Sequence, residues 1–88
     1  MNNENDLIKN IDNIHTTELG NIRIKRNLNL HIENVLNYCK NEIKKSKDIY
    51  RKGKNWYIIS GKQIFTINAH SYTLITAHII KGDNKNSL

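Results

Sequence analysis

The pattern of apolar side chains changes its period near residue 47, from the spacing of helices to the alternation of strands. Before this point apolar residues recur three and four apart, which predicts helices over residues 4–14, 17–27 and 30–46. After it, apolar and polar residues alternate between short polar turns, which predicts strands over residues 48–52, 55–60, 63–69 and 73–81. Connections this short join antiparallel neighbours. We therefore expect an α+β domain in which two to three N-terminal helices pack on a four-stranded antiparallel β-meander.

The third predicted helix carries the clearest apolar stripe in the chain. Its members lie on one face of a helix and are Ile32, Val35, Leu36, Cys39 and Ile43. Asn29 precedes the stripe and is the expected N-terminal cap of this helix. Because Cys39 lies within the stripe, we expect it to be a core residue and not a nucleophile.

The second predicted helix follows two threonines, Thr16 and Thr17, either of which is suited to cap it. Its apolar residues are expected to face inward: Leu19, Ile22 and Ile24. Gly20 weakens a helix by about 1 kcal/mol relative to Ala, so we expect another backbone to approach closely at this position.

Alternation assigns the residues of the last two strands to two faces of the sheet. We expect the core face to carry Phe65 and Ile67 together with Ile75, Ala77 and Ile79. The opposite, open face is then polar in its middle, with Thr66, Asn68, Thr76 and His78, and apolar at its ends, with Ile64, Leu74 and Ile80. Trp56 and Tyr57 are adjacent in one strand, so one is expected in the core and the other on the open face.

Length and composition predict a single domain over residues 1–81 with a polar, frayed tail over residues 82–88. The chain has 88 residues and one cysteine, which excludes a disulfide within the chain and suits a reducing, cytoplasmic setting. The N-terminus has no apolar run of the kind found in signal peptides, and no apolar stretch is long enough to span a membrane.

The positive charge is concentrated in the middle of the chain. Residues 1–22 carry one Lys and four acidic side chains, a net charge of −3, whereas residues 23–62 carry eleven Lys or Arg and three acids, a net charge of +8. Such a distribution favours a polyanionic partner such as a nucleic acid. Among nucleic acids, RNA is favoured by the candidate chemistry described below. The alternative is a solvated basic surface, since Lys40, Lys44, Lys45 and Lys47 also suit the negative end of a helix dipole.

Two groups of sequence motifs resemble a small bacterial family of unknown function. One group is Gly53-Lys54-Asn55-Trp56-Tyr57 with the segment from Thr66 to His78, and the other is His15-Thr16-Thr17-Glu18-Leu19-Gly20 with the segment from Arg23 to Leu28. The resemblance covers residues 14–81 and implies no activity. A looser similarity, in the order of elements, is to the barnase–EndoU–colicin–RelE class of small ribonucleases and toxins. It implies that a His and basic residues from the helices oppose Ser, Thr, Tyr or His from the last strands.

The segment from Asn68 to His78 supplies two imidazoles and several hydroxyls, which suit metal-independent cleavage of RNA. This reaction needs a base, an acid and cations around the phosphate, for which His and Arg side chains are suited. The candidate catalytic residues are His15, His70, His78, Arg23, Arg26, Ser71 and Thr73. The alternative for each His is a structural or surface role, and His31 is expected to be structural or incidental.

Two alternative functions are compatible with the sequence and involve no catalysis. A nucleic-acid-binding module would stack bases on exposed aromatics beside lysines, and the candidate residues are Lys25, Lys52, Lys54, Tyr57, Lys62 and Tyr72. A protein-interaction module would use the sheet edge or the apolar ends of the open face, for example to bind an antitoxin or another protein partner. A zinc site needs three or four converging ligands, and His70, His78 and Cys39 do not form a closely spaced set, so we expect no metal or other cofactor.

Overall fold

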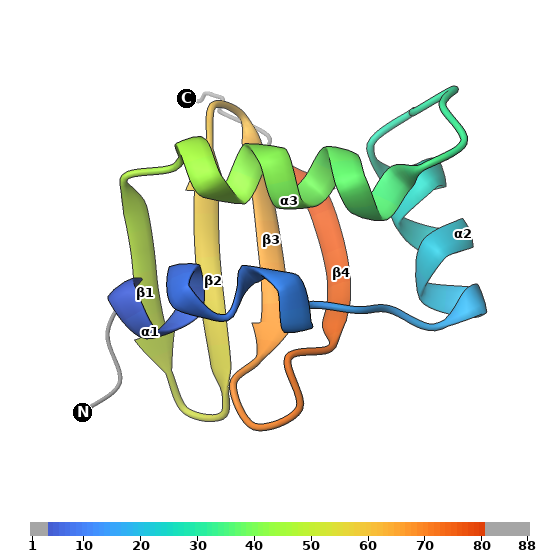
Figure 1. Cartoon of the computed structure of the whole chain (residues 1–88). Helices are drawn as coiled ribbons and strands as arrows, with labels where there is room; N and C mark the ends of the chain where they lie inside the picture. The colour runs from blue at the N-terminus through green and yellow to red at the C-terminus, as the bar shows by residue number, and fades with distance from the viewer. Residues whose placement is uncertain (1–3, 81–88) are drawn as a thin grey trace.

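The computed structural model describes residues 4–80 and shows helices packed on a single antiparallel sheet (Figure 1). The helical elements are α1 (Glu4–Lys9), the 3-10 helix η1 (Ile11–Asn13), α2 (Glu18–Asn27) and α3 (Val35–Lys45). The strands are β1 (Asp48–Lys52), β2 (Asn55–Ser60), β3 (Gln63–Asn68) and β4 (Leu74–Ile79). The predicted α+β class is confirmed. The predicted tail, residues 82–88, lies outside the described residues.

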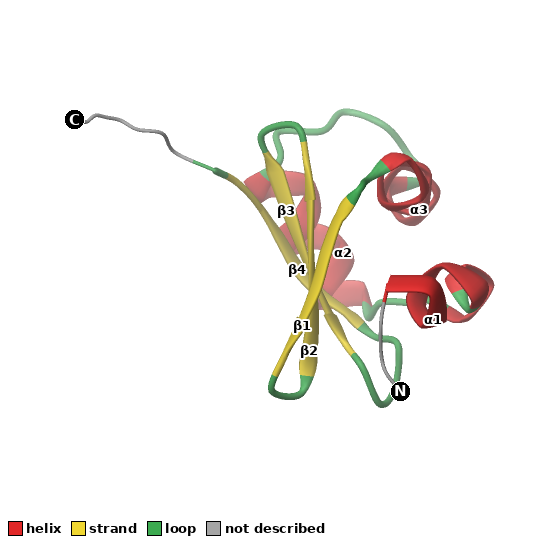
Figure 2. Ribbon diagram, turned by 90° about the vertical axis from the view of Figure 1, so that its left-hand side faces the viewer, coloured by secondary structure: helices red, strands yellow, loops and turns green. Residues whose placement is uncertain are grey.

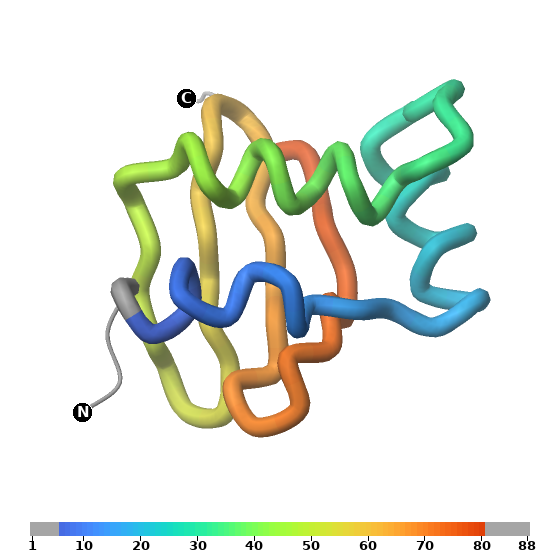
Figure 3. Tube along the Cα trace, viewed as in Figure 1, coloured from blue at the N-terminus to red at the C-terminus, as the bar shows by residue number. Residues whose placement is uncertain are grey.

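The four strands form a meander in the order β1-β2-β3-β4, and every neighbouring pair is antiparallel. Figure 2 shows the sheet edge-on, with α1 and α3 on the same side of it, and Figure 1 shows α2 standing beside β4. The trace in Figure 3 shows that α3 and the N-terminal segment, which comprises α1 and η1, both run across the strands. One face of the sheet is therefore covered by these elements, and we call it the core face.

The core lies between α3, the N-terminal segment and the core face. Trp56, Ile58, Phe65, Ile67, Leu74 and Ala77 contribute from the sheet, and each is at most 1% exposed. The helices contribute Leu7, Ile24, Val35, Cys39 and Ile43. The expectations that Cys39 and Ile24 are core residues are confirmed. Among the described residues no helix is both long and apolar enough to cross a membrane.

The third helix begins five residues later than its apolar pattern predicts. Its N-terminal cap is Asn34, whose side chain accepts a hydrogen bond from the backbone N–H of Asn37 at 2.9 Å. Asn29 is instead a left-handed residue (φ 56°) just after α2, where the N–H of Leu30 reaches back to the carbonyl of Lys25. The expected cap at Asn29 and the inward position of Ile32, which is 40% exposed, are both wrong.

The first two predicted helices also need correction. The single helix expected over residues 4–14 is divided at Asn10 into α1 and η1, and the Asn10 side chain donates to the carbonyl of Asp6 at 2.8 Å. In α2, Leu19 is 71% exposed and Ile22 is 53% exposed, so their predicted inward position is wrong. Thr17 caps α2 through a bond from the N–H of Gly20, and this places Gly20 and Ile24 on the buried face.

A β-bulge in β4 changes which of its residues face the core. Thr66 pairs with Thr76 and Ile67 pairs with Leu74, which leaves Ile75 as an extra residue in β4. The extra residue reverses the alternation, so Leu74 is buried and Ile75 is 37% exposed. The predictions that Leu74 lies on the open face and Ile75 on the core face are wrong. Ile79 was also expected in the core, but it lies at the strand end and is 44% exposed.

The outer edge of β4 is closed by the segment before α2 and by α2 itself. The backbone N–H of Leu74 donates to the carbonyl of His15, and the Thr16 hydroxyl donates to the carbonyl of Leu74 at 2.9 Å. Further along, the Asn27 side-chain amide donates to the carbonyl of Ala77 at 3.1 Å. These bonds satisfy edge groups that would otherwise be free to pair with another chain.

Candidate functional site

The open face of the sheet is the surface opposite the core face. The central row of this face joins Tyr50, Tyr57, Thr66 and Thr76 from the four strands. None of these four side chains is buried. Expectation and structure agree that Thr66, Asn68, Thr76 and His78 belong to this face. The structure also shows that Trp56 is the core member of its pair and that Tyr57 is the one on the open face.

A stacked tyrosine pair stands at the centre of the open face. The ring centroids of Tyr50 and Tyr57 are 5.5 Å apart, with 23° between the ring planes. Asn55 lies two residues before Tyr57 on the same face, and its side-chain amide lies 3.5 Å from the Tyr57 hydroxyl. Tyr57 is thereby held from two sides, by the ring of Tyr50 and by Asn55. Fixed aromatic rings of this kind are the groups on which nucleic-acid bases stack.

The predicted nucleic-acid-binding residues are distributed over several places. Lys52 lies on the open face in the row that joins it to Asn55 and Asn68. Lys54 is exposed in the turn between β1 and β2, and Lys62 is exposed in the turn between β2 and β3, at the other end of the sheet. Lys25 is exposed on α2, and Tyr72 is half-buried against the core. Lys52 and Tyr57 therefore share the open face, and the others border or leave it.

A chain of side-chain hydrogen bonds connects His15 to the β3–β4 connection. The Nε2 atom of His15 lies 3.1 Å from the Thr73 hydroxyl, and this hydroxyl lies 2.7 Å from that of Ser71. Ser71 Oγ lies 3.2 Å from the side-chain Oδ1 of Asn68, which also accepts from the backbone N–H groups of His70 and Ser71. Three of the predicted catalytic residues, His15, Ser71 and Thr73, are thus brought together from segments distant in sequence.

The directions of these bonds depend on the protonation of His15. Its Nδ1 lies 3.0 Å from the carbonyl of Asn13, which can only accept, so Nδ1 carries a proton. In the neutral ring Nε2 then accepts from Thr73, and Thr73 accepts from Ser71. In the protonated ring Nε2 donates to Thr73, Thr73 donates to Ser71, and Ser71 donates to Asn68, so every bond of the chain is made. A proton at His15 is therefore linked to the orientation of both hydroxyls.

The other predicted catalytic residues lie elsewhere. The imidazole of His78 lies 3.4 Å from the Asn27 amide and is joined to Thr76, near the far end of β4. His78 is five residues beyond Thr73, about 16 Å along an extended strand. Arg23 and Arg26 are exposed on α2, and neither makes an ion pair within residues 4–80. His31 is exposed in the loop before α3.

The β1–β2 turn and the β3–β4 connection lie beside each other at the same end of the sheet (Figure 1). A basic pocket is formed there. Its volume is about 640 Å³, and it is lined by Arg51, Lys54, Asn68, Ala69 and His70. The two loops are joined by a bond from the N–H of Ala69 to the carbonyl of Lys54 at 2.8 Å. Among residues 4–80, no acidic side chain lines this pocket. Arg51 and Asn68 have larger roles here than the sequence pattern suggested, although Asn68 stands at the start of a turn, where Asn commonly bonds the following backbone.

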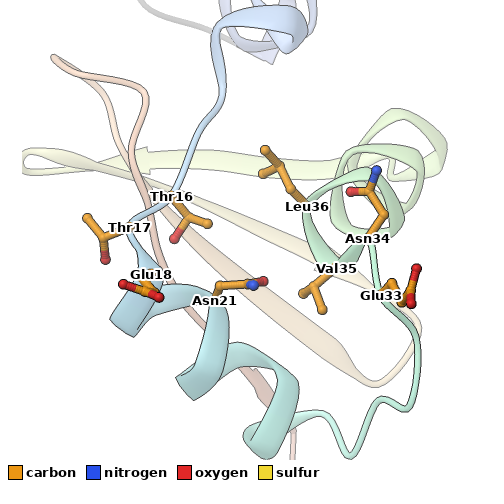
Figure 4. A pocket seen from close by; sticks show the side chains of 8 residues that line it. All are labelled: Thr16, Thr17, Glu18, Asn21, Glu33, Asn34, Val35 and Leu36. Atoms are coloured by element: carbon orange, nitrogen blue, oxygen red, sulfur yellow. The ribbon is translucent and has the colours of Figure 1, made fainter.

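A second pocket, of about 490 Å³, lies between the N-terminal ends of α2 and α3 (Figure 4). Figure 4 shows Thr16, Thr17, Glu18 and Asn21 on one side of it, and Glu33, Asn34, Val35 and Leu36 on the other. Its lining includes two carboxylates and no Lys or Arg. A phosphate would be repelled by Glu18 and Glu33, so this pocket does not suit a polyanion.

Cys39 has no place in a reactive site. It is fully buried, and burial is the main cause that raises the pKa of its thiol to about 12, with a smaller contribution from the Glu42 carboxylate. The thiol is therefore protonated at neutral pH and unreactive. Within residues 4–80 no three His, Cys, Asp or Glu side chains are grouped so as to hold a metal ion.

These features define a small α+β protein with helices on one face of a four-stranded meander and a polar, aromatic surface on the other. Residues 8–78 match the family described as protein of unknown function (DUF3781). The chain therefore belongs to this family, which confirms the resemblance to a family of unknown function seen in the motifs. No curated protein and no solved structure shows significant similarity to the chain.

Proposed function

We propose that this protein binds single-stranded RNA on the open face of its sheet. The observation that carries the proposal is the stacked pair of Tyr50 and Tyr57 on a face that no described helix covers. The pair stacks across neighbouring strands, so the second ring face of Tyr57 is directed toward β3, where the next residue of the row is the short side chain of Thr66. A base would stack against Tyr57 in this position.

The groups around the tyrosine pair supply the other contacts that single-stranded RNA needs. Thr66, Thr76, Asn55 and Asn68 offer donors and acceptors for base edges and 2′-hydroxyl groups. Lys52 lies on the same face, and the formal net charge of +6 attracts the phosphate backbone from a distance. Stacking of bases on an antiparallel sheet is a common mode of RNA recognition, and this likeness is one of fold class alone.

The test is a titration of fluorescently labelled eight-nucleotide RNA, with single-stranded DNA and duplex RNA of the same sequence as comparisons. We expect binding to the single-stranded RNA that weakens as salt is raised. Loss of one stacking platform in Tyr57→Ala should reduce the affinity about five- to 150-fold, which corresponds to roughly 1–3 kcal/mol. Tyr57→Phe keeps the ring and should bind nearly as well as the natural chain.

A control for the surface used is Lys44→Gln, which removes a positive charge from α3 on the covered side of the sheet. It should change the affinity only slightly. Absence of RNA binding at low salt, or equal binding by Tyr57→Ala and the natural chain, would contradict the proposal.

RNA cleavage is the second candidate function, and one observation favours it: the hydrogen-bonded chain of His15, Thr73 and Ser71. This arrangement holds one imidazole beside two hydroxyls, but the structure adds no second imidazole or arginine to it. Incubation of RNA with the protein in EDTA tests this function. RNA that stays intact supports binding alone, whereas cleavage that is lost in His15→Ala would establish a nuclease.

A further inference from the structure

We propose that the basic pocket formed by Arg51, Lys54 and His70 binds a terminal phosphate of the RNA strand held on the open face. This inference rests on the proposed function and extends it to a particular end of the ligand. The pocket lies at the end of the sheet where Asn68 belongs both to its lining and to the open face. Arg51 pairs with Trp56 and therefore lies on the core-face side of this end of the sheet, so the terminal nucleotide of a strand on the open face would pass around the end of the sheet, past Asn68, to reach Arg51.

Arg51 is held in a fixed position by two contacts. Its Nε donates to the carbonyl of Gly53 at 3.0 Å, and its guanidinium carbon lies 5.7 Å from the centroid of the Trp56 ring. Both contacts leave the two terminal amino groups of the guanidinium without a partner in residues 4–80. A guanidinium with these two groups free is suited to bind two phosphate oxygens at once.

Trp56 helps to position the Arg51 guanidinium, although the tryptophan side chain lowers the stability of the core. Its indole N–H is buried and has no acceptor among the described residues, which costs roughly 1–3 kcal/mol compared with a satisfied group. A phenylalanine would fill the core without this cost. The indole ring, however, is the best aromatic partner for a cation, and it lies against Arg51.

The remaining groups complete a site for an anion. Lys54 is exposed and makes no ion pair in the described structure. His70 is also exposed, and within the described residues only its backbone N–H is hydrogen-bonded, which leaves its imidazole without a partner. The side-chain Oδ1 of Asn68 fixes the connection, because it accepts from the backbone N–H groups of His70 and Ser71 and from the Ser71 hydroxyl. A terminal phosphate carries more negative charge than an internal one and is therefore attracted more strongly by Arg51 and Lys54. None of the described residues that line the pocket carries a carboxylate that would repel such a group.

The experiment compares three RNAs of one sequence, with a 5′-phosphate, with a 3′-phosphate, or with hydroxyls at both ends. We expect one phosphorylated RNA to bind about tenfold more tightly than the RNA without phosphate, because a bidentate charged contact is gained. Arg51→Gln should remove this preference and leave the affinity for the RNA without phosphate within about threefold. The Lys44→Gln variant should keep the preference. A melting curve of each variant verifies that it is folded.

Two outcomes would overturn the inference: equal affinity for all three RNAs, or a preference that survives in Arg51→Gln. If none of the three RNAs binds, the proposed function fails, and the pocket is tested by itself with inorganic pyrophosphate. Pyrophosphate should then shift the imidazole resonances of His70 in the natural chain and not in Arg51→Gln. Absence of a shift in the natural chain would show that the pocket does not bind phosphate.

Discussion

The two faces of the sheet are made from alternate residues of the same four strands, and they differ in almost every property. Ile58, Phe65 and Ala77 form one row of the core face and are fully buried, whereas the next row, on the open face, presents Tyr57, Thr66 and Thr76. The core face is apolar and packed by helices. The open face offers stacked rings, hydroxyls and amides. Polar groups are usual on a solvated sheet face, so the feature that sets this face apart is the stacked pair of Tyr50 and Tyr57.

The largest difference between the two faces is expected in the free energy of unfolding, when a side chain of the core face is truncated. Phe65→Ala should lower the free energy of unfolding by about 3–5 kcal/mol, because it leaves a cavity between the sheet and the helices. Its neighbour on the other face provides the control: Thr66→Ala should change the stability by at most about 0.5 kcal/mol. Urea unfolding of both variants measures this difference. Equal losses would show that Thr66 is packed as tightly as Phe65 and would contradict the difference between the two faces.

A smaller loss is expected at the edge of β4, where Gly20 meets Thr16. A Cβ atom at position 20 would clash with the Thr16 hydroxyl, which holds the carbonyl of Leu74. Gly20→Ala gains helix propensity of about 1 kcal/mol but should still destabilise the fold by about 1–3 kcal/mol in net terms. Asn21→Ala is the control on the same helix. The backbone expected to approach Gly20 is present as the carbonyl oxygen of Leu74, 3.7 Å from such a Cβ atom, but the tighter contact is with the Thr16 side chain. A stabilised Gly20→Ala variant in thermal unfolding would contradict this contact.

The smallest effect concerns the link between α3 and β2. The Glu42 carboxylate lies 3.0 Å from Lys45 Nζ and accepts from the Ser60 hydroxyl at 2.9 Å. Its pKa is lowered from the ordinary value of 4.5, first by the bond to Lys45 and then by the bond to Ser60, against a rise from burial. The resulting stability is present at neutral pH and is lost as the pH falls below about 4.5 through the lowered pKa.

Glu42→Gln should therefore be slightly less stable than the natural chain at pH 7 and should match it near pH 2. Thermal unfolding at both pH values measures the difference. A gap between the two proteins that stays constant across this range would show that the contribution of Glu42 is not one of charge.

The sequence predicted the sheet better than the helices, and the reasons are local. The turns at Gly53 and Gly61 both adopt positive φ, so β1 and β2 begin and end where their glycines and polar turns place them. In α3 the apolar period continues back to Ile32, but the side-chain bond of Asn34 starts the helix later. Periodicity cannot show which of several cap residues is used.

The candidate site was predictable in its parts and not in its arrangement. The hydroxyls and imidazoles between Asn68 and His78 were evident, but the bulge at Ile75 decides which side chains of β4 turn outward, and no sequence signal marks it. His15 reaches Thr73 through an isolated parallel bridge between segments 58 residues apart, a pairing that local pattern does not specify. The basic pocket depends on two loops that meet only in the folded chain.

The open face is tested most directly by methyl resonances measured with and without single-stranded RNA. The account predicts that RNA shifts the methyl groups of Thr66 and Thr76 and leaves those of Leu19 and Ile22, on the outer face of α2, unchanged. Shifts confined to Leu19 and Ile22, with Thr66 and Thr76 unaffected, would place the ligand on the helix and contradict the account.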